Sequence, residues 1–356
     1  MSGAFGWVRN DSHNTPPTRQ QTGGWFSRAV SAHKNPRVQK IGPDTPPVST
    51  PKPPPRKAFT QAASASIPTA THKLVATAAN VLIVACDVTG SMGDNPKEIF
   101  KRLPLMWQEA VTYLGSDDLE ILFICFGDAR TDSHAVQVAR FGREQELDQI
   151  LSSFYMNCGG GGQGSETPEL VAYYLLQQVD VSQARNVYTW IITDEAGCDR
   201  ISAPLVRRWL DLDVPSDLMD AKSVFTLLSR RMNLFTILFE TGAYYGAKAD
   251  AIAPYWKRVL PSPEAIVPLN DPRRIVDVML GTIAAMTGQL ALFTGQLKSR
   301  QLPTRHGSVN VATVMKSIAL VGKGTPSDPL HVPGAGTRPL LPGPTAGTKS
   351  LLDSSD

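Results

Sequence analysis

Oxygen-bearing side chains gather at the end of one strongly apolar run. The run from Val81 to Ala85 is apolar at every position, as a central strand of a parallel sheet is, and Asp87, Thr89 and Ser91 follow it at alternate positions. A turn at Gly90 can point these three side chains into one small volume. A carboxylate with two hydroxyls is a hard oxygen set that suits Mg²⁺, Mn²⁺ or Ca²⁺. The residue types therefore predict a divalent-cation site at this strand end.

Two later segments carry groups that suit the same site. A glycine-rich stretch ends in Glu166 and Thr167, just before a predicted helix, and Asp194 follows the predicted strand 186–193. In a doubly wound sheet with strand order 3-2-1-4, the first and fourth strands are neighbours, so their carboxyl ends can share one ligand. The sequence thus predicts that three distant segments meet at one edge of a sheet.

The elements that would position these residues alternate along the middle of the chain. Strands are predicted at 81–85, 118–127, 135–141, 186–193, 234–239 and 265–268, and helices at about 95–114, 143–154, 168–178, 219–231 and 271–297. This alternation predicts the α/β class: a doubly wound, mostly parallel sheet with right-handed crossovers and helices on both faces.

Charge is unevenly distributed over the 356 residues. Residues 1–75 hold ten Lys and Arg against two Asp and Glu, although the whole chain carries a net charge of +3. This stretch is rich in Pro, Ser and Thr, and cannot bury enough apolar surface to offset its ordering entropy. We expect a disordered basic arm at 1–75, a folded domain at 78–297 and a disordered Pro/Gly-rich tail at 298–356. The arm is interpreted as a solubilising tail, with nucleic-acid contact or proline recognition as alternatives.

The cysteines and the apolar runs indicate a cellular compartment. Four cysteines occur without CxxC or CxxH spacing, which favours reduced packing residues of a cytoplasmic protein. No run of eighteen apolar residues occurs, and no charged leader precedes an apolar segment at the N-terminus. We therefore expect neither a membrane span nor secretion.

Taken together, the three segments resemble the von Willebrand factor A (VWA) domain, of the intracellular prokaryotic or phage type. The residues DVTGSM from Asp87, the glycine run before Thr-Pro-Glu, and IITDE ending at Glu195 follow the chain order of that family. Its metal-ion-dependent adhesion site (MIDAS) has the pattern Asp-x-Ser/Thr-Gly-Ser, a distant Thr or Asp, and a final Asp. The resemblance covers about residues 78–297 and implies a Rossmann-like VWA fold.

The resemblance also implies a set of metal ligands: Asp87, Thr89, Ser91, Asp194 and either Glu166 or Thr167. Ser91 would bind the cation through its hydroxyl with Thr89 beside it, and the two aspartates would act through water or hydrogen bonds. Aligning on the Pro-Glu that follows places Glu166 at the middle position. Aligning on helix length places Thr167 there, which the chemistry at the metal slightly favours.

One departure from the family pattern changes the charge of the site. Glu195 stands where many members have Gly. Its carboxylate adds negative charge beside the predicted ligands and would strengthen cation retention.

A cation held mainly by hydroxyls and water-bridged carboxylates keeps an open coordination position, which a partner's Asp or Glu can fill. Residues and resemblance therefore predict a Mg²⁺-dependent protein-binding module, with Mn²⁺ or Ca²⁺ as alternatives, acting as an adaptor or regulatory subunit and not as an enzyme. Members of this type are often found with AAA+ ATPases of the MoxR class, or in stress-response sets with a kinase and a phosphatase.

Two other functions stay open. A metal-dependent phosphohydrolase could use Asp87, but the dehalogenase-type enzymes that begin in this way have Asp-x-Asp, and here Thr89 takes the second place. The glycine run also lacks the Gly-Lys-Ser/Thr of a phosphate-binding loop. The third reading is a structural or assembly protein whose cation site is degenerate.

Overall fold

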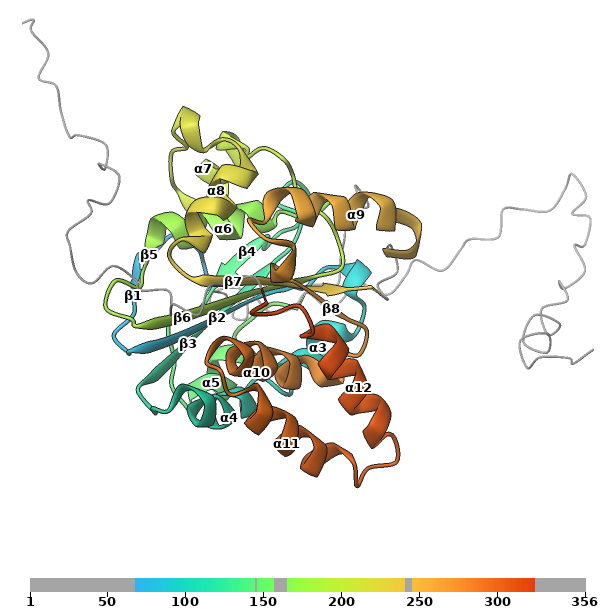
Figure 1. Ribbon diagram of the computed structural model, residues 1–356. Helices are drawn as coiled ribbons and strands as arrows, with labels where there is room; N and C mark the ends of the chain where they lie inside the picture. The colour runs from blue at the N-terminus through green and yellow to red at the C-terminus, as the bar shows by residue number, and fades with distance from the viewer. Residues whose placement is uncertain (1–67, 145, 157–164, 241–244, 324–356) are drawn as a thin grey trace, which may run out of the picture. The chain divides into compact units, whose positions relative to one another are not determined.

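One six-stranded sheet organises the chain, and its strand order is β4-β3-β2-β6-β7-β8 (Figure 1). The computed structural model describes residues 68–144, 146–156, 165–240 and 245–323. The strands are β2 (Asn80–Asp87), β3 (Leu119–Phe126), β4 (Val136–Val138), β6 (Asn186–Thr193), β7 (Asn233–Phe239) and β8 (Ile266–Leu269). β4 is antiparallel to β3, whereas the other neighbours are parallel. The predicted α/β class and the 3-2-1-4 order are confirmed.

Helices cover both faces of this sheet, because successive residues of its strands point to opposite sides. In β2, Val81, Ile83 and Ala85 belong to one apolar core, and Leu82 and Val84 belong to the other. In Figure 1 the first face is covered by α6 (Pro168–Gln178), α7 (Ala203–Leu210), α8 (Ala221–Ser229) and α9 (Tyr245–Val259). The second is covered by α3 (Asn95–Phe100), α4 (Leu105–Leu114), α5 (Glu146–Ser152), α10 (Ile275–Met286), α11 (Leu290–Gln301) and α12 (Gly307–Ser317).

Both edge strands of the sheet are short. β4 has three residues and β8 has four. Within β8, Pro268 lies opposite Leu238 of β7. A separate pair of short parallel strands, β1 (Leu74–Val75) and β5 (Val179–Asp180), lies outside the main sheet.

Two helices predicted as continuous are each divided in two. The predicted helix 95–114 is α3 and α4, and Pro104 lies at the start of the second, where its missing N–H breaks the hydrogen-bond ladder. The predicted helix 271–297 is α10 and α11. Between them Gly288 has a φ of 73°, a left-handed conformation that glycine adopts without steric cost.

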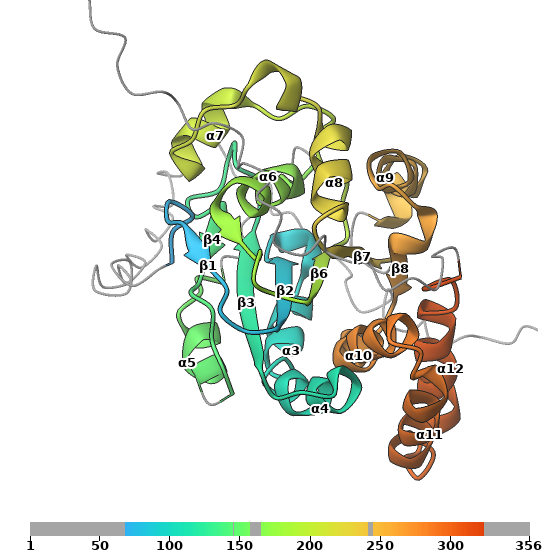
Figure 2. The same cartoon turned by 60° about the vertical axis from the view of Figure 1, so that its left-hand side comes forward.

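The folded part extends further toward the C-terminus than the sequence predicted. Residues 298–356 were assigned to a disordered tail, yet α11 runs to Gln301 and α12 follows it. α12 contacts α10, α11 and β8, as Figure 2 shows, and it buries Val311 and Val314 in the second core. The predictions made for residues 1–67 and 324–356 and for the glycine run 158–164 lie outside the described residues.

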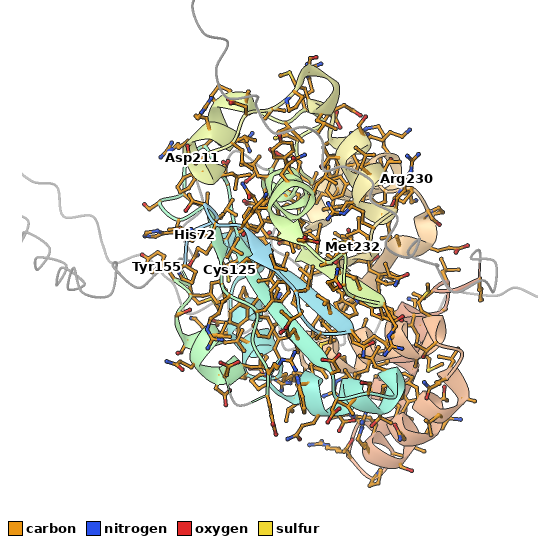
Figure 3. The ribbon with its side chains drawn as sticks, turned by 90° about the vertical axis from the view of Figure 1, so that its left-hand side faces the viewer. His72, Cys125, Tyr155, Asp211, Arg230 and Met232 are labelled. Atoms are coloured by element: carbon orange, nitrogen blue, oxygen red, sulfur yellow. The ribbon has the colours of Figure 1, made fainter. Side chains whose placement is uncertain are left out.

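The cysteines that the structure describes are all free thiols. Cys86 and Cys125 face each other across β2 and β3 and are fully buried, and Figure 3 shows Cys125 inside the sheet. Burial raises the pKa of both thiols well above its usual value. Cys198 is half-buried, and Cys158 lies outside the described residues. Within the described ranges, no helix is long and apolar enough to cross a membrane.

Candidate metal-binding site

Asp87 closes β2, and hydrogen bonds from the protein engage both of its carboxylate oxygens. Oδ1 accepts from the backbone N–H of Thr89 at 2.9 Å and from the Thr89 hydroxyl at 2.6 Å. Oδ2 accepts from the Thr193 hydroxyl, at the end of β6, at 2.8 Å. Asp87 is completely buried. In this geometry, Asp87 holds the hydroxyls of Thr89 and Thr193 in place.

Ser91 connects this strand end to the end of β6. It lies in a single 3₁₀ turn, Gly90–Met92, that follows β2. Its Oγ is 3.0 Å from Oγ1 of Thr89 and donates a hydrogen bond to Oδ1 of Asp194 at 2.9 Å. β2 and β6 are direct neighbours in the sheet, with Cys86 opposite Ile192. Residues 103 positions apart thus meet at one point on the sheet edge.

The two candidates for the middle position are differently engaged. The Thr167 hydroxyl donates to the backbone carbonyl of Gly127 at 2.6 Å and accepts from the N–H of Ala129 at 3.2 Å, so it joins the start of α6 to the end of β3. Glu166 is 6% exposed, and its Oε2 has no hydrogen-bond partner. Of the two alternatives, Glu166 has a buried oxygen without a hydrogen-bond partner, whereas the Thr167 hydroxyl is already engaged by two backbone groups.

The carboxylates around this point raise one another's pKa values. Burial, followed by the charge of Asp194, raises the pKa of Asp87 to about 7. Burial, followed by the charges of Asp87 and Glu195, raises the pKa of Glu166 to about 10. The pKa of Asp194 rises to about 6, mainly through burial, although the hydrogen bond from Ser91 opposes the shift. Negative charge concentrated in this way is what a divalent cation would neutralise.

Unpartnered oxygens test whether these residues fit a cation. Three buried carboxylate oxygens in the described part of the chain have no hydrogen-bond partner: Glu166 Oε2, Asp194 Oδ2 and Glu195 Oε2. A buried oxygen left in this state costs free energy unless a cation or a proton compensates it. In their chemistry, these oxygens and the hydroxyls of Thr89 and Ser91 are of the hard type that suits Mg²⁺, Mn²⁺ or Ca²⁺. Among the described residues, no group of three or more Asp, Glu, His or Cys side chains is placed so that it could hold a metal ion.

Thr193 takes part in the site although sequence reasoning did not select it. Its hydroxyl donates to Asp87 and accepts from the backbone N–H of Glu195 at 3.1 Å. The pairing register of β2 and β6 could have identified this residue. Because Ile192 lies opposite Cys86, the next residue of β6 stands beside Asp87.

Arg130 provides a positive charge at the rim of the site. Its Nε donates to Oδ1 of the buried Asp128 at 2.7 Å, and its guanidinium also donates to the Ser165 hydroxyl at 3.0 Å. It therefore ties the loop after β3 to the residue that precedes Glu166. Sequence reasoning did not select this arginine, since no spacing pattern marks it.

No protein-family model and no curated protein matches the chain. It is similar to the solved pilus adhesin SpaC from Lactobacillus rhamnosus GG, with 10% identity and a TM-score of 0.42 over 62% of this chain and 31% of that one. It is similar to proximal thread matrix protein 1 from the mussel byssus, with 9% identity and a TM-score of 0.39 over 60% and 49%. A further structure of that mussel protein has a zinc-occupied MIDAS motif. This chain thus spans about a third of the adhesin and half of the mussel protein.

A third solved structure is the vWF domain of the type V pili tip protein Mfa5 from Porphyromonas gingivalis. The identity is 9% and the TM-score 0.41, over 60% of this chain and 97% of that domain.

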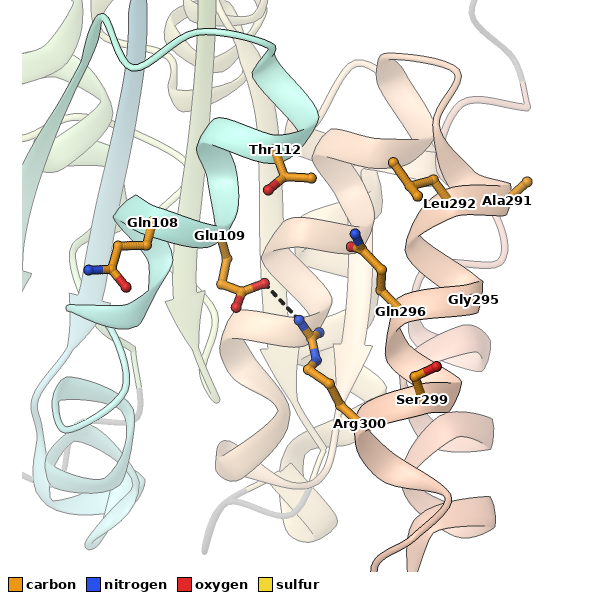
Figure 4. Close-up of a pocket in the computed structure, with 9 residues that line it drawn as sticks. All are labelled: Gln108, Glu109, Thr112, Ala291, Leu292, Gly295, Gln296, Ser299 and Arg300. Carbon is orange, nitrogen blue, oxygen red and sulfur yellow. Dashed lines mark hydrogen bonds and ion pairs between the residues drawn. The ribbon is translucent and has the colours of Figure 1, made fainter.

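A groove elsewhere on the domain contains none of the candidate residues. It lies between α4 and α11, and an ion pair of 2.7 Å between Glu109 and Arg300 crosses it (Figure 4). Its lining combines polar side chains, among them Gln108, Thr112 and Gln296, with the apolar Ala291 and Leu292. The groove therefore supplies no ligand to the candidate cation site.

Proposed function

We propose that this chain is a metal-dependent protein-binding module. A divalent cation, Mg²⁺ in the first instance, is held where β2 and β6 end, and a carboxylate from a partner protein completes its coordination. In this proposal the chain acts as a cytoplasmic adaptor or regulatory subunit and performs no catalysis. An AAA+ ATPase of the MoxR class, or a stress-signalling set with a kinase and a phosphatase, is the kind of assembly in which it works.

The observation that carries the proposal is the hydrogen bond between Ser91 and Asp194. It brings a hydroxyl from one loop and a carboxylate from another to a common point, and Oδ2 of Asp194 remains without a partner there. A packing role for Asp194 would leave that oxygen uncompensated, at a cost of about 1–3 kcal/mol. Cation binding accounts for the free oxygen.

Each residue has a distinct task in this proposal. Ser91, Asp194 and Glu166 offer oxygens to the cation, whereas Asp87 orients the hydroxyl of Thr89. When bound, the cation supplies an electrophilic centre for an acidic side chain. Thr167 holds the loop after β3 against α6, which keeps Glu166 at the site.

Calorimetric titration of chelator-treated protein with Mg²⁺ tests the proposal. Wild type should bind one cation, and Ser91→Ala and Asp194→Asn should each bind it at least about tenfold more weakly. Ser229→Ala is the matched control, because it removes a hydroxyl that is bonded to a carbonyl inside α8 and should leave cation affinity unchanged. If wild type bound no cation, the degenerate-site alternative would replace the proposal.

Partner capture tests the second half of the proposal. Proteins retained from the source cell by wild type should be lost with chelator and with Asp87→Ala. The same set of retained proteins in all three conditions would remove the metal from the mechanism. The enzyme alternative predicts metal-dependent hydrolysis of a simple phosphate ester that Asp87→Asn abolishes.

A further inference from the structure

Glu195 is a buried acid whose backbone is fixed on both sides. It follows Asp194 and is 3% exposed. Its N–H donates to the Thr193 hydroxyl at 3.1 Å, and its carbonyl accepts from the indole Nε1 of Trp256 at 3.0 Å. Trp256 is itself completely buried in α9. These two hydrogen bonds fix the backbone of Glu195 and therefore the position from which its side chain extends.

The Glu195 carboxylate interacts with the Ser91 hydroxyl, which is the same group that Asp194 contacts. Ser91, which donates to Asp194, also interacts with Glu195 and lowers its pKa, against a larger increase caused by burial. Oε2 of Glu195 and Oδ2 of Asp194 are both buried without a hydrogen-bond partner. Two consecutive residues thus bring two unpartnered oxygens to the vicinity of one hydroxyl.

A packing role does not account for this carboxylate. A buried Glu is more costly than a small or apolar residue unless its charge is compensated. The positive charge of Lys248 acts on Glu195, but the carboxylates of Asp128 and Glu166 lie on the same electrostatic network. Arg130 already compensates Asp128, whereas Oε2 of Glu195 stays buried without a hydrogen-bond partner, which is a state that a bound divalent cation would compensate.

We propose that Glu195 is a further ligand of the divalent cation, so that Ser91, Asp194 and Glu195 bind it together from the ends of β2 and β6. The inference rests on the proposed function and extends it. With the Glu195 carboxylate added to those of Asp194 and Glu166, the isolated chain retains its cation before any partner contributes an acid. The adjacent carboxylates make the site one for a hard divalent ion of the Mg²⁺, Mn²⁺ or Ca²⁺ class.

The test is titration of the full chain with Mn²⁺ alone, at about pH 7.5 after chelator treatment. Glu195→Gln keeps the size of the side chain and removes its charge, and should weaken Mn²⁺ binding at least about tenfold. Asp132→Asn is the matched control, because Asp132 lies on the same electrostatic network while its Oδ2 accepts from the N–H of Asp128. Because Asp132 would act on the cation only through its distant charge, Asp132→Asn should weaken Mn²⁺ binding by about threefold or less.

A double variant distinguishes a shared ion from independent effects. If Glu195 and Ser91 bind the same cation, the affinity losses of Glu195→Gln and Ser91→Ala should fail to add in the combined variant. Should Glu195→Gln not fold, Glu195→Asp retains the charge on a shorter side chain and should still weaken binding.

The outcomes separate the two proposals. Mn²⁺ affinity within about threefold of wild type in Glu195→Gln, together with a large loss in Ser91→Ala, overturns the inference and leaves the cation site standing. Absence of Mn²⁺ binding to wild type overturns both.

Discussion

Asp87 and Asp194 end neighbouring strands but have different tasks. Three donors occupy the two oxygens of Asp87, whereas Asp194 accepts one hydrogen bond from Ser91 on Oδ1 and leaves Oδ2 unpartnered. The chemistry available to a carboxylate depends on how many of its lone pairs the protein has already used. Asp87 is therefore a residue that positions hydroxyls, and Asp194 is one that can bind an ion.

The raised carboxyl pKa values predict how the cation-free protein responds to pH. A carboxyl with a raised pKa favours the folded state when it is protonated. Its contribution to stability is complete below the unfolded value of about 4 and is lost as pH rises through the folded value. For Asp194 and Asp87 these folded values are about 6 and about 7. We expect the free energy of unfolding in chelator to fall between about pH 4 and pH 7 because of these two groups, as denaturant titration would measure.

The matched comparison is Asp194→Asn, which should flatten that pH dependence because it removes one titrating group. Mg²⁺ should restore stability in wild type, and more so at the upper end of the range, since the cation competes with protons for the same oxygens. A wild-type stability that rises steadily with pH in chelator would contradict the prediction.

Mutations of Glu166 and Thr167 should have different effects on stability and on Mg²⁺ affinity. Thr167→Val leaves the Gly127 carbonyl and the Ala129 N–H without their partner, so it should lower the free energy of unfolding by about 1–3 kcal/mol. The folded fraction should still bind Mg²⁺ with an affinity close to that of wild type. Glu166→Gln should have the opposite profile, with little loss of stability and weaker Mg²⁺ binding. Equal effects of both variants on affinity would instead make Thr167 a ligand.

At the level of the elements, the first turn of α6 holds the loop that follows β6. The N–H of Glu166 donates to the Ala196 carbonyl at 3.0 Å, and Oε2 of the buried Glu169 accepts from the N–H of Cys198 at 3.2 Å. Gly197 lies between these two contacts. The position of Asp194 and Glu195 thus depends on close packing of a helix start against a short loop.

We expect Gly197→Ala to destabilise the protein by about 1–3 kcal/mol, because added atoms in a packed site force their neighbours to move. A Cβ at this position would clash with the Tyr255 hydroxyl and would lie 2.7 Å from Cγ of Pro168. Gly295→Ala is the control, since a Cβ there meets nothing within 4 Å in helix α11. That change should stabilise by up to about 1 kcal/mol. Thermal unfolding of both variants measures the difference, and equal melting temperatures would refute it.

Continuous apolar runs made the central strands predictable, while several helices were not. β6 occupies the predicted positions 186–193, because a strand buried on both faces is rich in apolar, aromatic and β-branched residues. α9 was missed, and it carries Pro254 in its interior, which pattern reasoning treats as a helix breaker. In the candidate site, the topology indicated that Ser91 and Asp194 would meet. The hydrogen-bond partner of Thr167 could not be predicted, since it is a backbone carbonyl on another strand end.

For the whole molecule, the folded part includes two helices beyond α10. α12 is rich in Val, Thr, Ser and Asn and begins with Gly, all weak helix formers, so its sequence gave no strong helical signal, and tertiary contacts with the second core decide its conformation. The last described residue is Lys323. A shortened chain that ended at the predicted boundary of residue 297 would remove these contacts.

Two valines of α12 test this extent of the fold. Val314 is fully buried, so Val314→Ala should cost about 1–3 kcal/mol of unfolding free energy through lost contacts and a residual cavity. Val309, in the same helix, is 63% exposed, and Val309→Ala should change stability by less than about 0.5 kcal/mol. Denaturant titration of the pair gives the answer. Equal and small effects would mean that α12 does not contribute to the stability of the domain.

The short outer strands of the sheet have a consequence for behaviour at high concentration. An exposed strand edge offers unpaired N–H and C=O groups onto which another chain can add. Here β4 provides three residues for such an addition, and β8 provides four, one of them Pro268, which has no N–H to donate. Neither edge strand is a good template for intermolecular β-pairing, so the short edges of the sheet disfavour aggregation by sheet extension.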